Sequence, residues 1–286
     1  MADAYIVETA RTAGGRRGGA LRDWHPADLG AEVLNALVAR SGIDASVIDD
    51  VIVGCVSQGG EQAFAFGRNC VLASKLPQSV PAVTIDRQCG SSQQAVQFAA
   101  QAVMSGTQDV VVAMGVESMT RVPMGSNVSL YAKAGIGEGP FSDRIDAKYG
   151  TKNFSQFIGA EMVAKKHGFN REQLDSFALE SHRRAKTACD TGVFDTEIIP
   201  LEVEGGMHTR DEGIRDDATL DSISNVKLLD PDGMISAANA SQICDGAAGV
   251  LVVSEAALKK YNLTPKARII NLTVTAGDPV LMLEEP

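Results

Sequence analysis

Short apolar runs alternate with stretches of helical periodicity over the first 120 residues. Leu29, Val33 and Leu37 recur at helical spacing after Pro26, a residue that fits the first turn of a helix. The strand-like runs lie at residues 5–7, 51–53, 83–86 and 110–114. The last of these runs is apolar throughout, as expected of a central strand that is covered on both faces. A second helix is expected over residues 95–104, ending at Gly106. The alternation therefore predicts a layered α/β domain.

The pattern weakens between residues 120 and 150, where glycine, serine and proline recur, which predicts a long loop or a small inserted subdomain. Two helices are expected beyond it, the first over residues 157–167. Asn170 followed by Gln173 has the form of a capping box and predicts the start of the second helix. The apolar face of that helix is expected to consist of Leu174, Phe177, Ala178, Ser181 and Ala185. Further strand-like runs lie at residues 198–199, 247–253 and 267–274.

Charge and composition exclude several classes of protein. The 286 residues carry a formal net charge of −10, which argues against nucleic-acid or anionic-membrane binding through clustered basic charge. No apolar run approaches the length of a membrane span, and the first ten residues have no signal-peptide pattern. The five cysteines form neither a C-x-x-C pair nor a cluster with histidine, so no metal site and no disulfide framework are predicted. A cytoplasmic location is expected.

Cys89 lies where a predicted strand ends and a predicted helix begins. Gly90 allows a ligand or another backbone to approach closely, and Ser91 or Ser92 is expected to cap the helix. The positive end of the helix dipole would then face the sulfur and favour the nucleophilic thiolate. The layout resembles the strand–turn–helix elbow of α/β-hydrolases, with sulfur in place of oxygen.

The alternative interpretation is that Cys89 is a small buried hydrophobic residue, as most free cysteines are. The other four cysteines are interpreted as structural, and they are Cys55, Cys70, Cys189 and Cys244.

The sequence resembles the thiolases, the acetyl-CoA acyltransferases, in six segments that occur in family order. These segments are IVETART at 6–12, VIVGCVSQ at 51–58, DRQCGSS at 86–92, GVESMT at 115–120, FALESHRRA at 177–185, and NAS at 239–241 followed by DGAA at 245–248. The resemblance implies a fold of two similar βαβαβαββ halves with a loop domain inserted after the first. On this interpretation residues 1–120 are the first half, residues 121–262 the loop domain, and residues 263–286 the first strand of a second half that is otherwise absent.

The resemblance also implies the chemistry and the site. The cysteine that matches Cys89 accepts an acyl group from an acyl-CoA, and a second CoA thiol or an acetyl-CoA enolate then attacks the acyl-enzyme. Arg215, Ser222 and Ser241 match family residues that contact CoA along its nucleotide and pantetheine parts. CoA and its thioesters are then substrates in fatty acid metabolism, and no further cofactor is implied. Without the resemblance, Arg215 would be interpreted as a solvated charge and the two serines as turn or cap residues.

The sequence also departs from the family pattern. The family's Asn-Glu-Ala-Phe, Gly-His-Pro and Cys-x-Gly-Gly segments do not occur in these 286 residues. These segments supply the histidine that activates the nucleophile and the second cysteine that moves a proton. We therefore expect negligible turnover from this chain alone and consider a separate C-terminal half as a partner. The four histidines present are interpreted as structural or solvated, and they are His25, His167, His182 and His208.

Two other functions stay open at this point. The same absences fit a non-catalytic, thiolase-like subunit that binds acyl-CoA or serves assembly. A relative of the ketoacyl synthases would share the fold and a cysteine nucleophile, but the context of Cys89 in residues 87–92 suits thiolases better. The family resemblance implies a homodimer or homotetramer.

Overall fold

The computed structural model describes residues 3–286 and divides into two compact units. The first unit consists of the described residues up to Asn127 together with Phe194–Gly213 and Ile243–Leu272. The second consists of Val128–Val193, Ile214–Gln242 and Thr273–Pro286. The two units interleave along the chain, because the chain returns to the first unit twice. The expected division at residues 120 and 262 concerns the family's domains and stays a prediction.

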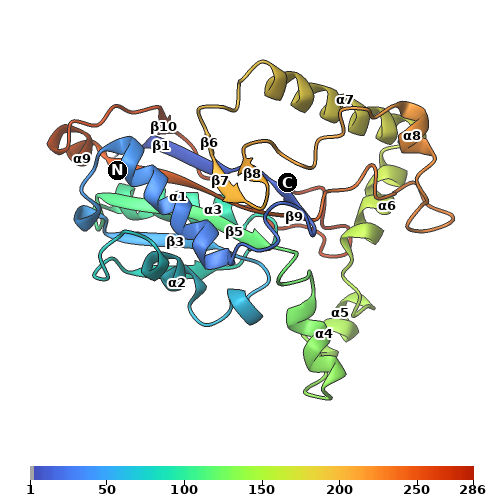
Figure 1. The fold of residues 1–286 in the computed structure, drawn as a ribbon. Helices are drawn as coiled ribbons and strands as arrows, with labels where there is room; N and C mark the ends of the chain where they lie inside the picture. Colours follow the sequence, from blue (N-terminus) through green and yellow to red (C-terminus); the bar gives the residue numbers. More distant parts are fainter. Residues whose placement is uncertain (1–2) are drawn as a thin grey trace. The chain divides into compact units, whose positions relative to one another are not determined.

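A mixed sheet of eight strands forms the centre of the first unit. Figure 1 shows the longer strands of this sheet side by side. Its main path runs β10-β1-β9-β5-β3-β4. β3 pairs in parallel with both β4 and β5, whereas β9 runs antiparallel to its neighbours β5 and β1. The strands are β1 (Ala4–Thr12), β2 (Gly15–Arg16), β3 (Asp50–Gly54), β4 (Ala82–Ile85), β5 (Val110–Ser118), β6 (Ile198–Ile199), β9 (Cys244–Ser254) and β10 (Ala267–Ile269).

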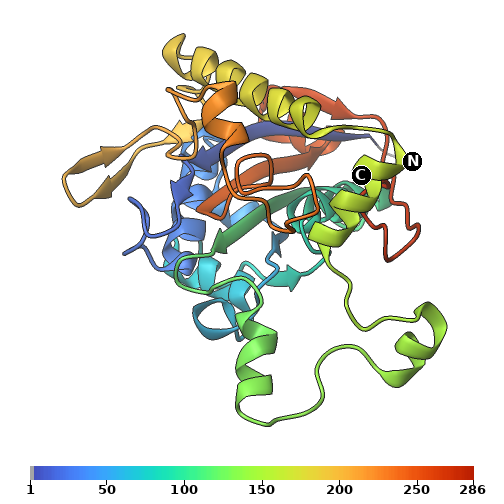
Figure 2. The same cartoon turned by 90° about the vertical axis from the view of Figure 1, so that its right-hand side faces the viewer.

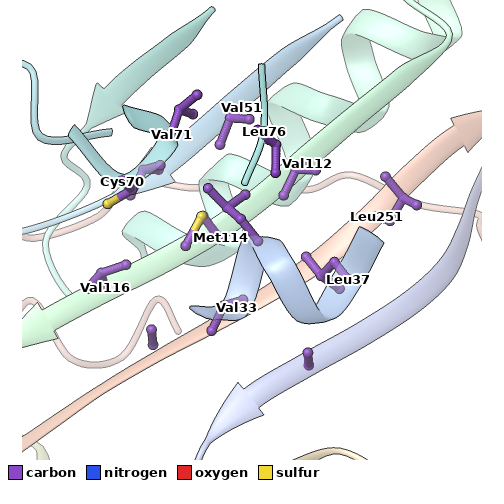
Figure 3. Packing of buried hydrophobic residues seen from close by; sticks show 14 of the residues in the cluster. Val33, Leu37, Val51, Cys70, Val71, Leu76, Val112, Met114, Val116 and Leu251 are labelled. Carbon is purple, nitrogen blue, oxygen red and sulfur yellow. The ribbon is translucent and has the colours of Figure 1, made fainter. Parts of the chain in front are cut away.

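Helices cover both faces of this sheet, which confirms the predicted layered α/β architecture. α1 (Pro26–Ser41) and α2 (Phe66–Ala73) pack on one face, and α3 (Ser91–Ser105) packs on the other. Figure 3 shows the first of these layers, in which Val33 and Leu37 from α1 meet Met114 and Leu251 from the sheet. The alternating side chains of β5 supply both layers, so this strand is apolar along its length, as expected.

Smaller elements complete the first unit. The 3₁₀ helices span Ala45–Val47 and Gly60–Gln62, and α9 spans Glu255–Lys260. β7 (Leu201–Val203) and β8 (Gly206–His208) form a separate two-stranded hairpin, drawn in gold at the left of Figure 2.

The second unit is helical among the described residues. Its helices are α5 (Asp143–Tyr149), α6 (Gln156–Lys166), α7 (Arg171–Asp190) and α8 (Leu220–Ser224), and α4 (Ser126–Lys133) begins at the boundary of the two units. The capping box predicted at Asn170 and Gln173 is present and starts α7. None of the helices that the structure describes is long and apolar enough to cross a membrane.

Two predictions about individual elements are wrong. The predicted strand over residues 267–274 ends at Ile269, because only its first three residues pair with β1. The predicted apolar face of α7 is not buried, since the side chain of Phe177 is 80% exposed. The fully buried residue of this helix is instead Asp175.

Candidate functional site

Cys89 lies in a tight turn between β4 and α3 and is exposed to solvent. Gln88 adopts a left-handed backbone conformation, with φ of 46°, which is uncommon for a residue other than glycine. The carboxylate of Asp86 accepts a hydrogen bond from the Gln88 N–H at 2.6 Å and holds this conformation. The turn therefore presents the sulfur at the surface, and the interpretation of Cys89 as a buried hydrophobic residue is wrong.

The expected serine cap of α3 is wrong. The N-cap is Gly90, and no side chain caps the helix. Ser91 instead fastens the turn, because its hydroxyl accepts from the Arg87 N–H at 2.8 Å and donates to the Gln88 carbonyl at 2.6 Å. The first N–H groups of a helix have no intrahelical acceptor. Cys89 therefore precedes the electropositive end of α3.

Two glycines on neighbouring strands allow α3 to approach the sheet. A Cβ atom on Gly54, at the end of β3, would lie 2.4 Å from the Ser91 carbonyl carbon and 2.5 Å from the Ser92 nitrogen. A Cβ on Gly115, in β5, would lie 2.6 Å from the Cβ of Ser92. The start of α3, and with it the position of Cys89, is thus set by backbone packing on β3 and β5.

A half-buried carboxylate and a buried amide fix the loops at the same edge of the sheet. The Glu117 carboxylate accepts hydrogen bonds from the Val56 and Ser57 N–H groups and from the Gln62 side chain, at 2.9, 3.2 and 2.9 Å. Gln62 is fully buried and also accepts from the Ser118 N–H at 2.7 Å. Because buried polar groups are costly when unpaired, this network holds the segments that follow β3 and β5 in one arrangement.

No sequence pattern indicates that Gln62 joins this network, because its part in the network depends on its burial in the folded chain. Glu117 lies inside one of the family-like segments, at residues 115–120, but its contacts were not predicted.

Two of the other four cysteines differ clearly from Cys89 in their surroundings, whereas Cys189 is half-buried and Cys244 is exposed. Cys55 and Cys70 are buried, as expected of structural residues. Burial raises the pKa of the Cys70 thiol to about 12. Burial and the nearby Glu117 carboxylate also raise the pKa of the Cys55 thiol. These two thiols are therefore held in the unreactive neutral form, because the thiolate is the nucleophile.

The three residues predicted to contact CoA all belong to the second unit and are all exposed. The Arg215 guanidinium has no ion-pair partner among residues 3–286. Ser222 belongs to a capping box at the start of α8, where its hydroxyl accepts from the Thr219 N–H and donates to the Thr219 carbonyl. Ser241 lies in a loop without regular structure. Their role toward CoA stays a prediction.

The four histidines all have partners in their own units. The His25 side chain caps α1, and the buried His208 ring lies 3.2 Å from the Ala13 carbonyl. His167 pairs with Glu284, and the Nδ1 atom of His182 accepts a hydrogen bond from the Arg215 N–H at 3.2 Å.

Within residues 3–286, no three or more histidine, cysteine, aspartate or glutamate residues gather as a metal ion would require. A hollow of about 470 Å³ in the first unit contains none of the predicted site residues. Its walls include Trp24 and His25.

Comparison with known proteins places these features in a family context. The family described as "Thiolase, N-terminal domain" matches residues 4–256. The steroid 3-ketoacyl-CoA thiolase of Mycobacterium tuberculosis is 44% identical over 288 residues, which cover 100% of this chain and 70% of that protein. The 3-ketoacyl-CoA thiolase of an Enterobacter species is 39% identical over 291 residues, which cover 99% of this chain and 72% of that protein.

A solved structure is also similar to this chain. The crystal structure of the Bacillus anthracis acetyl-CoA acetyltransferase superposes with a TM-score of 0.85 at 31% identity. The match covers 98% of this chain and 73% of the other chain.

Proposed function

Because the chain belongs to the thiolase family, we propose that it acts as an acyltransferase that forms or cleaves 3-ketoacyl-CoA through an acyl group carried on Cys89. The observation that supports this role most directly is the exposure of Cys89 in the turn between β4 and α3. Cys55 and Cys70 are buried and cannot reach a substrate without unfolding.

In the direction of cleavage, the Cys89 thiolate attacks the 3-keto carbon of the substrate. A bond forms between this carbon and the Cys89 sulfur, and the bond between C2 and C3 breaks. The electron pair of the broken bond leaves as the enolate of acetyl-CoA, which takes up a proton. The thiol of a second CoA then attacks the acyl group, releases a shortened acyl-CoA and returns the proton to Cys89. The condensing direction reverses these steps.

The second unit supplies the proposed CoA contacts. A guanidinium such as that of Arg215 suits phosphate binding and stacking on adenine. The hydroxyls of Ser222 and Ser241 suit the amides of pantetheine, since a hydroxyl can donate and accept. The Ser222 hydroxyl already serves the cap of α8, so a CoA contact there would use its remaining lone pair. We propose CoA and its thioesters as the substrates, with no further cofactor, and a cytoplasmic homo-oligomer as the working form.

The proposed chemistry also needs a base and an acid, which the family takes from histidine and cysteine segments that these 286 residues do not contain. We therefore expect the chain alone to cleave acetoacetyl-CoA with CoA at a negligible rate. Co-expression with the C-terminal segment of the Mycobacterium tuberculosis relative should produce turnover. Cys89→Ala should abolish that turnover, whereas Cys70→Ser should retain it. The assay follows the loss of the 3-ketoacyl-CoA.

Titration calorimetry separates the outcomes. Heat on adding CoA without turnover after co-expression would favour a non-catalytic CoA-binding subunit. The absence of both heat and turnover would contradict the proposed function and this alternative together.

A further inference from the structure

Helix α7 presents three polar side chains, Arg171, Asp175 and His182, on one face. Asp175 and His182 follow Arg171 by four and eleven residues, and these spacings bring the three side chains to nearly the same angle around the helix. Each contacts a different segment of the second unit, and each of these segments carries one of the proposed CoA contacts. Phe177 and Ser181 lie elsewhere on the helix surface and are exposed.

Arg171 contacts the end of α8, the helix that carries Ser222. The Nη2 nitrogen of its guanidinium lies 3.2, 3.4 and 3.5 Å from the carbonyl oxygens of Ile223, Ser224 and Val226, which share its two N–H donors. The last carbonyls of a helix lack a full set of intrahelical donors, and these contacts tie the end of α8 to α7. The Ile223 carbonyl also accepts from the Val226 N–H at 3.1 Å. The same Arg171 nitrogen lies 3.4 Å from the hydroxyl of Ser236, which is fully buried.

Asp175 holds the loop that leads to Ser241. One of its carboxylate oxygens accepts from the Arg171 guanidinium at 2.6 Å, and the other accepts from the Asn239 side-chain amide at 2.9 Å. The same amide donates to the Met234 carbonyl, and its oxygen accepts from the Ser236 N–H. The Asp175 side chain is completely buried, so this charge depends on its two partners.

His182 holds the segment that carries Arg215. Its Nδ1 atom accepts the Arg215 N–H at 3.2 Å, which requires the tautomer with the proton on Nε2. This bond fixes the Arg215 backbone and leaves its side chain exposed for a ligand.

Glu161 on α6 holds the same loop as Asp175 from a second helix, through bonds from the Met234 and Ile235 N–H groups at 2.7 and 2.8 Å. The loop before Ser241 is thus fastened by two helices.

We propose that Arg171, Asp175 and His182 are positioning residues that align the segments of Arg215, Ser222 and Ser241 for CoA. This proposal rests on the proposed function, because it takes CoA as the ligand of these segments. It assigns the three side chains no contact with the substrate. Their effect on CoA passes through the backbone that they hold.

The test uses titration calorimetry of CoA with the full chain and its variants. His182→Ala should weaken CoA binding about three- to tenfold, the range expected for one lost hydrogen bond. His182→Asn should restore most of the affinity, because the amide oxygen of asparagine can take the place of Nδ1. Ser181→Ala, one residue away and exposed, is the matched control and should bind CoA like the wild type.

Arg171→Lys and Asp175→Asn test the buried part of the network. Arg171→Lys keeps the charge but loses the branched donor group, so CoA binding should weaken about tenfold or more. The rate at which iodoacetamide labels Cys89 should stay unchanged, since that residue belongs to the other unit. The His182 variants keep the proposal testable even if both buried variants unfold.

The outcomes distinguish the two proposals. Wild-type affinity in His182→Ala, or equal loss in His182→Ala and His182→Asn, would overturn the positioning role while leaving the proposed function intact. A wild-type chain that binds no CoA would overturn the proposed function and the positioning role with it.

Discussion

The reactivity of the cysteines is decided by where each side chain lies. Cys89 is exposed in a turn, whereas burial raises the pKa of Cys55 and Cys70 and keeps both thiols neutral. At neutral pH, iodoacetamide should therefore label Cys89 well before Cys55 and Cys70, as measured by mass spectrometry of peptides from the native protein.

The control for this prediction is the unfolded chain, in which urea should bring the labelling rates of these three cysteines close together. Equal labelling in the native protein would contradict the argument from burial.

Gly54 shows how one missing Cβ sets the position of Cys89. In Gly54→Ala the new atom would meet backbone atoms of Ser91 and Ser92, which cannot move aside as a flexible side chain can. We expect a loss of about 1–3 kcal/mol in the free energy of unfolding, as for other overpacked sites. The labelling rate of Cys89 should change as well, because the start of α3 must shift.

Urea denaturation and peptide labelling measure the two effects. Gly14→Ala is the matched control, since its Cβ would meet only the Asp211 carboxylate at an ordinary 3.4 Å. A Gly54→Ala protein with unchanged stability would show that the strand end tolerates a side chain.

At the scale of elements, residues 194–213 are fastened to β1 by an ion-pair network. Asp211 accepts from the Arg11 guanidinium at 2.8 and 3.1 Å and from the Gly14 N–H at 2.6 Å. Burial acts to raise the pKa of Asp211, but these hydrogen bonds outweigh it and hold the pKa below its ordinary value. The stabilisation is thus complete above the ordinary carboxylate pKa and is lost as the pH falls through the lowered pKa.

Asp211→Asn should therefore lower the free energy of unfolding by about 1.5–3 kcal/mol at pH 7, the range for hydrogen bonds to charged groups. The difference from the wild type should narrow as the pH falls through the acid range. Urea denaturation over a pH series measures both effects, with the exposed Asp217→Asn as control. A difference that grows toward acid pH would refute this account of Asp211.

Element boundaries were predictable where a local signal exists. The capping box that starts α7 and the apolar run of β5 both follow from short-range chemistry. The prediction of a buried apolar face on α7 was wrong, because periodicity shows which residues share a face but does not show whether other residues cover that face. Nothing in the sequence distinguishes Asp175 from an exposed carboxylate, since its partner Asn239 is far away along the chain.

At the scale of the whole molecule, the layered α/β fold was predictable from alternation, and the position of Cys89 from its motif. The place of β9 was not predictable from periodicity, because an antiparallel strand between β1 and β5 depends on pairing between residues remote in sequence. The same limit applies to the roles proposed for Arg171 and His182, which depend on contacts with α8 and with Arg215. Motifs identify groups that do chemistry, whereas the groups that hold them appear only in the folded chain.

The position of β9 has a consequence for how the protein is made. Val111 in β5 pairs with Val252 in β9. The middle of the sheet therefore cannot form until β9, which is synthesised long after β1 and β5, is available. Until residues 244–254 leave the ribosome, β1 and β5 each expose an edge that lacks its partner. Contacts between such distant residues slow folding, because a long loop must close before they form. The nascent chain therefore passes through a stage that is open to wrong strand pairing, and chaperones that shield hydrophobic edges would act during that interval.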